Sequence, residues 1–482
     1  MTAEIQALCT DRVFHHFHEI CQIPHRSGNE KGISDYLLNW ARGLGLEAEQ
    51  DQVLNVLIRK PASPGREEQP GVMLQAHMDM VCEKAEGVEH DFTKDPIRWV
   101  IDNDVLSTGG RTTLGADDGI GVALAMAILE DDQLVHPALE VLFTVMEEED
   151  FTGANGFEAS EIHASYLINL DHTSDQEIIC GSCGGMQVDL QIPVSFGPTP
   201  AGWTTYRLSV SGLKGGHSGE DIHRGRGNAN ILLARLLMAA EELCGCGLAQ
   251  IRGGSFRLAI PREAEAILCL DPVHVPALKE NLAGLEAEFQ AELAATAQQV
   301  VVSLEPAQPA EQCARPGSVI TALTLIPDGI YQMNEVLTGL VDTSDNLGEV
   351  YLEPSQLHCV LEIRSARNSL GTYLFQRMER LAALLGGSCQ WCSAYPSWDF
   401  RPESGLRTVC SQVYEEMFGF EPHFLTVHAG LEVGCFFARR PGLDAVAIGP
   451  NCRDFHSPTE ALEISSVKKV YRYLCRVLEA IR

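Results

Sequence analysis

The chain has 482 residues, enough for two or three domains, and its apolar fraction of 45% and charged fraction of 21% are typical of a folded globular protein. With 35 Lys and Arg against 66 Asp and Glu, the formal net charge is −31, which repels nucleic-acid backbones and anionic membrane surfaces. We therefore expect no nucleic-acid partner and no membrane partner, and a single acidic residue says little about a site.

The N-terminus has no basic segment followed by an apolar run, and no stretch of about 18 apolar residues occurs, so we expect neither a signal peptide nor a membrane span. Sixteen Cys in such a chain indicate free thiols in a reducing compartment, the cytoplasm. Close pairs of Cys are better explained as buried or incidental thiols than as zinc or redox motifs; they are Cys180/Cys183, Cys244/Cys246 and Cys389/Cys392.

Four short apolar segments bounded by turn residues predict buried strands, at residues 71–76, 140–146, 166–170 and 444–448. Apolar residues at helical spacing predict helices at 119–129 and 464–481. Strands that alternate with helices favour an α/β fold, with a mostly parallel sheet covered by helices on both faces.

The middle of the chain has a different pattern, typical of an inserted α+β domain. It predicts strands at 206–210, 300–304 and 358–363 and helices at 228–243, 275–297 and 369–385, with a glycine-rich loop at 212–227. Prolines after residue 192 and the pair Gly386–Gly387 mark the edges of this domain. We therefore expect a catalytic domain made of residues 1–190 and 388–482, with an inserted domain at 191–387.

Each of the four predicted buried strands leads into residues of the types that bind metal ions. Open parallel sheets place their sites beyond the carboxyl ends of the strands, so these side chains are expected to share one crevice. A further acidic residue, Asp117, precedes the apolar helix. There it can sit at the positive helix terminus and offer one oxygen to each of two cations. The strand-end candidates are His77 and Asp79, Glu147 and Glu148, Asp171, and His456.

Taken singly, these residues have ordinary explanations. Asp171 can cap a helix, Asp117 can form a turn, and the acidic run 147–150 can be a solvated loop. Their joint occurrence in this order favours a metal site. Two His with several carboxylates suit Zn²⁺, Mn²⁺ or Co²⁺, and the lack of Cys among them argues against a closed structural zinc site.

The chain also resembles the M20 metallopeptidases, and within them most closely the bacterial aminoacyl-histidine dipeptidases. Matching stretches follow one another along nearly the whole chain: NVLIRKPASPG, LQAHMDMVCEK, TTLGADDGIGVALA, VLFTVMEEEDFTGA, INLD, GLKGGHSGEDIHRGRGNAN, HAGLEVG and HSPTE. The segments HMDMV, TLGADDGIG and GGHSGEDIHRGRGNAN are the specific ones.

The resemblance implies a centre of two divalent metal ions, of which Zn²⁺ is the expected species, with Mn²⁺ or Co²⁺ as alternatives. His77 and Asp171 would bind one ion, Glu148 and His456 would bind the other, and Asp117 would bridge them. Asp79 would orient the His77 ring, and Glu147 would be the general base. The acidic residues that follow, Glu149 and Asp150, leave open which adjacent glutamate has which role.

By the same resemblance the substrate is a small peptide, a dipeptide of Xaa-His or broader type. The inserted domain would act as a lid and dimerisation surface of a homodimer. His217 would reach in from the partner subunit to hold the oxyanion, and Arg364 would bind the substrate carboxylate bidentately. Gly430 would let the backbone approach the substrate.

Three other functions fit part of the sequence. The same metal site could serve an aminoacylase, a deacetylase or a tripeptidase. The spacing Gly181-Ser-Cys183-Gly-Gly185 is that of a nucleophile elbow, although no apolar strand is expected to run straight into it and no His partner is evident. A non-catalytic scaffold that retains an enzyme fold is the third alternative.

Overall fold

The chain forms two compact units in the computed structural model, which describes residues 2–296, 299–335, 339–440 and 442–482. The first unit comprises Met1–Gly181, Trp398–Thr426 and Leu431–Arg482, and the second comprises Ser182–Ser397 and Val427–Gly430. The edges expected near residues 190 and 387 lie within the second unit. Residue 190 belongs to the strand β9 (Gly184–Pro193), and residue 387 directly precedes the strand β21 (Ser388–Tyr395).

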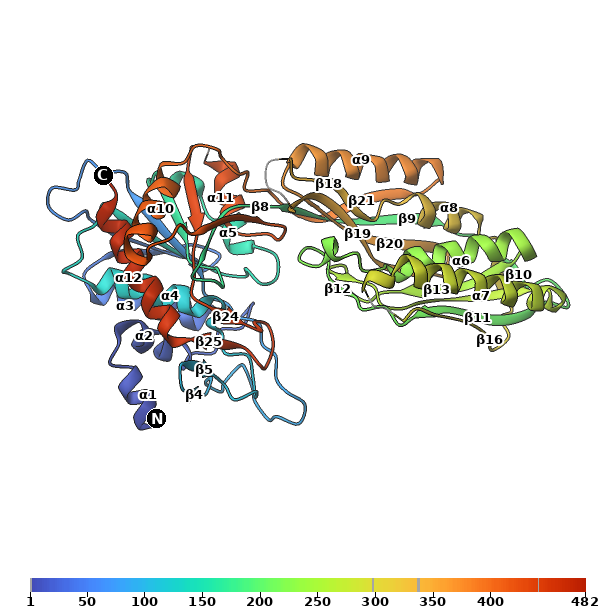
Figure 1. Ribbon diagram of the computed structural model, residues 1–482, viewed down its shortest axis with the longest axis horizontal. Helices are drawn as coiled ribbons and strands as arrows, with labels where there is room; N and C mark the ends of the chain where they lie inside the picture. Colours follow the sequence, from blue (N-terminus) through green and yellow to red (C-terminus); the bar gives the residue numbers. More distant parts are fainter. Residues whose placement is uncertain (1, 297–298, 336–338, 441) are drawn as a thin grey trace. The chain divides into compact units, whose positions relative to one another are not determined.

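The first unit is built on an eight-stranded sheet of order β1-β2-β6-β3-β7-β23-β8-β22 (Figure 1). Parallel pairing joins β6, β3, β7 and β23, whereas β1, β2 and β8 pair antiparallel with their neighbours. The predicted α/β architecture is confirmed, with the parallel part confined to the four central strands. The strands of this sheet are β1 Glu47–Gln50, β2 Val56–Lys60, β3 Val72–His77, β6 Leu139–Thr144, β7 Tyr166–Asn169, β8 Glu177–Ser182, β22 His423–Val427 and β23 Asp444–Ala447.

The central strands of this sheet are buried because helices cover it. Val72, Leu74 and Ala76 of β3 pack into one core with α2, α3, α4, α10 and α12, while Gln75 between them points to the other face. A small four-stranded sheet, β24-β25-β5-β4, completes the unit. The remaining elements are α1 Ala3–Leu8, α2 Arg12–Ile20, α3 Lys31–Gly43, β4 Val100–Asp102, β5 Val105–Ser107, α4 Ala116–Glu130, α5 Thr152–Gly156, α10 Gly405–Phe418, α11 Val433–Arg439, β24 Cys452–Arg453, β25 Ala461–Glu463 and α12 Ile464–Ala480.

The second unit is built on an antiparallel sheet with the main order β16-β11-β15-β13-β19-β20-β9-β21, to which β10, β17 and β18 add at the sides, and its helices pack on one face. The strands β12 and β14 form a separate two-stranded sheet. The core of the second unit alternates along the strands, as Val188, Leu190 and Ile192 of β9 show. This alternation is that of a sheet with one buried face. The strands are β9 Gly184–Pro193, β10 Phe196–Pro198, β11 Thr204–Ser211, β12 Gly216–His217, β13 Gly247–Gly253, β14 Ala259–Ile260, β15 Ala264–Leu270, β16 Val301–Pro306, β17 Gln312–Ala314, β18 Gly329–Met333, β19 Val341–Glu353, β20 Gln356–Ser365 and β21 Ser388–Tyr395.

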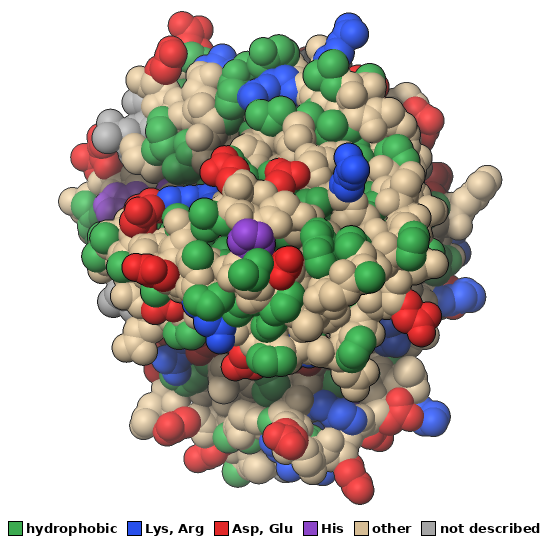
Figure 2. All heavy atoms as spheres, turned by 90° about the vertical axis from the view of Figure 1, so that its right-hand side faces the viewer, with side chains coloured by type: hydrophobic (Ala, Val, Ile, Leu, Met, Phe, Trp, Pro, Cys, Tyr) green, Lys and Arg blue, Asp and Glu red, His purple; other side chains and the backbone are tan. Residues whose placement is uncertain are grey.

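The helices of the second unit are α6 Ala229–Cys244, α7 Val275–Glu292, α8 Gly317–Leu325 and α9 Asn368–Leu384. The helix expected over 275–297 begins at Val275 but ends at Glu292, and residue 297 lies outside the described residues. Figure 2, which looks onto the right-hand side of Figure 1, shows apolar, acidic and basic side chains interspersed over that face. Among the helices of the described part of the chain, none is long and apolar enough to cross a membrane.

Candidate metal centre

Three neighbouring parallel strands of the first unit end at one group of polar side chains. His77 is the last residue of β3. Glu147 and Glu148 lie in the turn that follows β6, and Asp171 lies two residues beyond β7. Because β6, β3 and β7 run parallel and side by side, their carboxyl ends bring these residues together.

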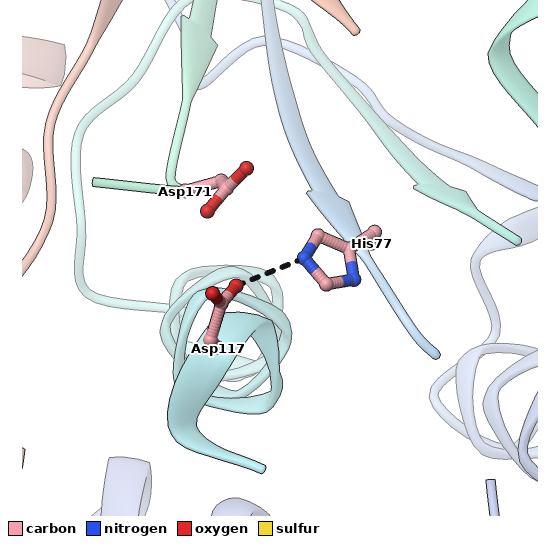
Figure 3. A group of neighbouring side chains, drawn as sticks. All are labelled: His77, Asp117 and Asp171. Carbon is pink, nitrogen blue, oxygen red and sulfur yellow. Dashed lines mark hydrogen bonds and ion pairs between the residues drawn. The ribbon is translucent and has the colours of Figure 1, made fainter. Parts of the chain in front are cut away.

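Asp117 lies between two histidines from distant parts of the chain. It occupies the first turn of α4, where its backbone is not helical (φ −84°, ψ 108°). Its Oδ1 is 3.1 Å from Nε2 of His77, and its Oδ2 is 3.2 Å from Nε2 of His456. Figure 3 shows the side chains of Asp117, His77 and Asp171 directed toward one another. The two oxygens of Asp117 thus face different ring nitrogens, as a bridging carboxylate requires.

The candidate ligand atoms form three overlapping groups, each with its atoms within 4.8 Å of one another. Two of the groups share Asp117, and two share His77. The His456 ring also lies 2.9 Å from Oε1 of Glu148. Imidazole and carboxylate donors packed this closely suit borderline divalent cations, so the residues present fit a metal centre. The groups are His77, Asp117 and Asp171; His77, Glu147 and Glu148; and Asp117, Glu148 and His456.

The crowding of carboxylates is visible in their proton affinities. Burial, with the charge of Asp117, raises the pKa of Asp171 to about 8. Burial also raises the pKa of Glu147 and of Glu148, and the charge of a neighbouring carboxylate raises each pKa further. Burial lowers the affinity of His456 for a proton, but its bonds with Asp117 and Glu148 outweigh that effect and raise its pKa to about 10. Protons or cations are therefore needed here to balance the negative charge.

Asp79 connects His77 to the turn that carries the two glutamates. The Nδ1 atom of His77 lies 3.0 Å from the carbonyl oxygen of Asp79 and 3.4 Å from its Oδ1. The Asp79 carboxylate accepts hydrogen bonds from the backbone N–H groups of Glu147 (3.0 Å) and Glu148 (3.3 Å) and from the Ser27 hydroxyl (2.8 Å). Asp79 therefore orients more than the ring, because it also fixes the acidic turn.

A buried carboxylate that the sequence did not predict holds the start of α4. Glu460, 1% exposed, accepts hydrogen bonds from the N–H groups of Leu114 (2.7 Å), Gly115 (3.1 Å), Ala116 (2.8 Å) and Asp117 (3.4 Å). We expected the carboxylate of Asp117 itself to lie at the positive helix terminus, but the N–H groups there donate to the Glu460 carboxylate. Since Glu460 stands four residues after His456, it ties the loop of one candidate ligand to the turn of another.

The second unit brings the three candidate substrate-binding residues near one another. Arg364, 3% exposed, donates to the Tyr395 hydroxyl (3.0 Å). A Cβ atom on Gly430 would lie 2.4 Å from the Tyr395 ring, so only glycine allows this packing. A Cβ atom on Gly219 would lie 3.2 Å from both the Arg364 Nε and the His217 Cε1, so both side chains lie next to this glycine.

The tautomer of His217 follows from its surroundings. Its Nδ1 accepts from the backbone N–H groups of Gly219 (3.3 Å) and Glu220 (3.1 Å), so the proton of the neutral ring is on Nε2 and can be donated. Another histidine, His428, lies in the same cluster, with its Nε2 2.7 Å from the Ser344 hydroxyl. Burial, with the charge of Arg364, lowers the pKa of His428 to about 3. The motif HAGLEVG contains His428, but the sequence indicated only its glycine.

The alternative cysteine nucleophile has the wrong environment. Contrary to our expectation, a strand does run into it, because β8 ends at Ser182. However, Cys183 is followed by the strand β9 and not by the helix of a nucleophile elbow. Burial raises the pKa of Cys183 to about 11, which keeps it as an unreactive thiol near neutral pH.

Comparisons with known proteins agree with this geometry. Residues 73–480 match the model of peptidase family M20/M25/M40. The chain is 37% identical to the cytosol non-specific dipeptidase of Escherichia coli (strain K12), over 99% of each sequence. The structure of aminoacylhistidine dipeptidase from Vibrio alginolyticus aligns with a TM-score of 0.89 at 36% identity, covering 100% of this chain and 98% of that one. Aminopeptidase PepT from Bacillus cereus, at 15% identity and a TM-score of 0.56 over 98% of each chain, shares the fold.

The chain therefore belongs to peptidase family M20/M25/M40, and it is a metallopeptidase. Both the family match and the full-length relatives cover the strand ends on which the candidate ligands lie.

Glu460→Gln tests the support of α4. The amide keeps the shape, but its NH₂ group faces backbone donors that lose their acceptor, and an unsatisfied buried donor costs about 1–3 kcal/mol. We expect a lower free energy of unfolding and weaker divalent-metal binding, measured by urea unfolding and by competition with a chromogenic chelator. Glu416→Gln, an exposed position on α10, makes the same charge change and is the control. Equal behaviour of the two variants would contradict the assigned role of Glu460.

Asp171→Asn tests the crowding of charge in the metal-free protein. The carboxyl ionises near pH 3.8 when unfolded but near pH 8 when folded, so the folded state binds more protons between these values. Stability contributed by this group is therefore lost as the pH rises from about 4 to 8. With chelator present, we expect the urea midpoint of the variant to exceed that of the parent. The difference should be larger at pH 8 than at pH 5. A gain that does not change with pH would exclude this assignment.

Proposed function

We propose that this protein is a dipeptidase whose hydrolytic centre holds two divalent metal ions. The observation that carries the proposal is the position of Asp117, whose two carboxylate oxygens face His77 and His456 separately. Two full-length relatives at 36–37% identity are dipeptidases by name, which supports the same class of substrate here.

In this proposal His77 and Asp171 would bind one ion, Glu148 and His456 would bind the other, and Asp117 would bind both. Zn²⁺ is the expected species, and Mn²⁺ and Co²⁺ are alternatives with similar ligand preferences. When bound, such a pair of ions polarises the scissile carbonyl and supplies an activated water. Asp79 keeps the Nδ1 side of the His77 ring engaged, so that Nε2 points to the metal site.

Glu147 is the proposed general base. Its Oε2 lies 4.0 Å from Nε2 of His77, and its side chain is 12% exposed, so it borders the ligand atoms without being closed off. Burial and the charges of Glu148 and Asp171 raise its pKa, which makes its carboxylate a stronger base. Such a carboxylate would accept a proton from water and later donate it to the leaving amine. Two adjacent glutamates can thus have different tasks.

The residues of the second unit are proposed to bind the substrate. The Nε2–H of His217 would donate to the developing oxyanion, and Arg364 would bind the free C-terminal carboxylate of a dipeptide. Gly430, where the Tyr395 ring occupies the space of a side chain, would bring its backbone close to the substrate. This unit would act as a lid that excludes water on closing, and we propose a homodimer whose partner subunit supplies His217. We also propose a cytoplasmic location, as the name of one relative suggests for that protein.

Metal content measured together with activity on a peptide panel tests the function. We expect two divalent ions per chain and hydrolysis of unblocked dipeptides, Xaa-His among them, with little activity on tripeptides or N-acylated amino acids. Chelation should abolish turnover. Glu147→Gln should retain the metal but lose about 10²–10⁴-fold in kcat, the usual contribution of a general base. Parent protein that binds no metal, or that prefers acylated amino acids, would refute the proposal.

Arg364→Lys tests carboxylate recognition. Lysine keeps the charge but lacks the planar fork, so a bidentate bond would be lost. We expect KM for dipeptides to rise about tenfold with a smaller change in kcat, and no change for dipeptide amides, which lack the carboxylate. Arg257→Lys, which alters an ion pair with Glu362 in the same unit, is the matched control. A variant that affects free and amidated dipeptides equally would show that Arg364 has a structural role only.

A further inference from the structure

A row of buried polar side chains lies directly beneath the candidate metal centre. It consists of Thr144 at the end of β6, Gln75 near the end of β3 and Asn169 at the end of β7, each of them at most 1% exposed. The Asn169 amide donates to Gln75 Oε1 (2.7 Å), and the Gln75 amide donates to Thr144 Oγ1 (3.2 Å). The row therefore crosses the same three strands whose ends carry the candidate ligands.

The row ends at an acidic side chain from a distant part of the chain. Glu432, which immediately precedes α11 and is 2% exposed, accepts hydrogen bonds at Oε2 from Gln75 Nε2 and Thr144 Oγ1, both at 2.6 Å. Hydrogen bonds to a carboxylate are about twice as strong as neutral ones, and these are short. A single carboxylate thus joins the ends of β3 and β6.

At its other end the row reaches a candidate ligand. Asn169 Oδ1 accepts from the backbone N–H of Asp171 at 3.2 Å. His77 follows Gln75 by two residues, and Glu147 follows Thr144 by three. A shift of any member of the row therefore displaces a residue of the metal centre.

Glu432 has an unusual charge environment for a purely structural residue. Its Oε1 is buried and has no hydrogen-bond partner among the described residues. Glu432 bonds to Gln75, two residues before His77, and to Thr144, three residues before Glu147, so its carboxylate lies close to the site itself. The ionised form of a buried carboxylate with one unbonded oxygen is disfavoured in a metal-free protein. It is favoured once cations lie nearby.

We propose that Glu432 is a positioning residue for the peptidase reaction, which holds the ends of β3, β6 and β7 in register through Gln75 and Thr144 and strengthens metal binding by its negative charge. Glu432 contacts no candidate ligand side chain by a hydrogen bond, so it acts through other residues. The inference rests on the proposed function only for the activity readout, because metal affinity is measured independently.

Two substitutions separate the geometric and the electrostatic part of this role. Glu432→Gln keeps an oxygen that can accept from Gln75 and Thr144 but removes the charge. Glu432→Ala removes both. Residues that support metal ligands in this way typically contribute roughly 10–100-fold to metal affinity or activity. We expect Glu432→Ala to weaken metal binding and lower kcat by about that factor with KM nearly unchanged, and Glu432→Gln to restore part of the loss.

A double-mutant cycle with Thr144→Val keeps the test decisive if Glu432→Ala folds poorly. Thr144→Val removes one donor to Glu432, and combined with Glu432→Gln it should show non-additive effects on the metal dissociation constant, since both changes affect the same bond. Glu415→Ala, exposed on α10, is the control. Parent-like metal affinity and kcat in Glu432→Ala, or strict additivity in the cycle, would overturn the proposal. Tight metal binding without peptidase activity in the parent would instead refute the proposed function and leave the effect on metal affinity testable.

Discussion

The structure of the first unit depends on one electrostatic constraint: several partly buried carboxylates lie close together at the ends of the parallel strands, with two imidazole rings among them. Asp117, Glu148 and Asp171 share this space with His77 and His456. Burial alone opposes ionisation of these acids, and their mutual repulsion adds to it. Such a group is stable when cations balance it, which explains why residues from five separate segments of the chain are held at contact distance.

The fold meets this constraint by fixing backbone and not only side chains. Asp79 holds the N–H groups of the acidic turn, and Glu460 holds those at the start of α4. Neither carboxylate forms a hydrogen bond with a side chain of Glu147, Glu148 or Asp117. Because a parallel sheet fixes the strand ends relative to one another, these few additional bonds are enough to orient the ligand side chains. The acids that orient the site are therefore distinct from the acids proposed to bind the metal.

The sequence predicted the elements that carry the site because their signals are local. A fully apolar run such as that ending at His77 indicates a buried strand, and the position of the candidate ligand follows from where the run stops. Glu432 and Glu460 gave no such signal, because their hydrogen-bond partners are far away in the sequence. The partners of Glu460, Leu114 to Asp117, are 343–346 residues away, and those of Glu432, Gln75 and Thr144, are 357 and 288 residues away. In the second unit, long strands such as β19, whose first eight residues are buried despite the polar sequence DTSDN, likewise escaped an interpretation based on apolar runs.

The polarity of the second unit is complementary to that of the first. The first unit collects negative charge at the candidate metal centre. The second holds the guanidinium of Arg364 and the ring of His217, whose Nδ1 accepts hydrogen bonds so that Nε2 carries the proton, with a neutral His428 in the same cluster. A dipeptide presents a carbonyl oxygen that becomes negative during hydrolysis and a terminal carboxylate, both of which require donors. Under the proposed function, each unit would hold the groups for one of these two tasks, so each set can be preorganised separately. The proposed preference for dipeptides would then rest on the short distance between the scissile carbonyl and the terminal carboxylate of such a substrate.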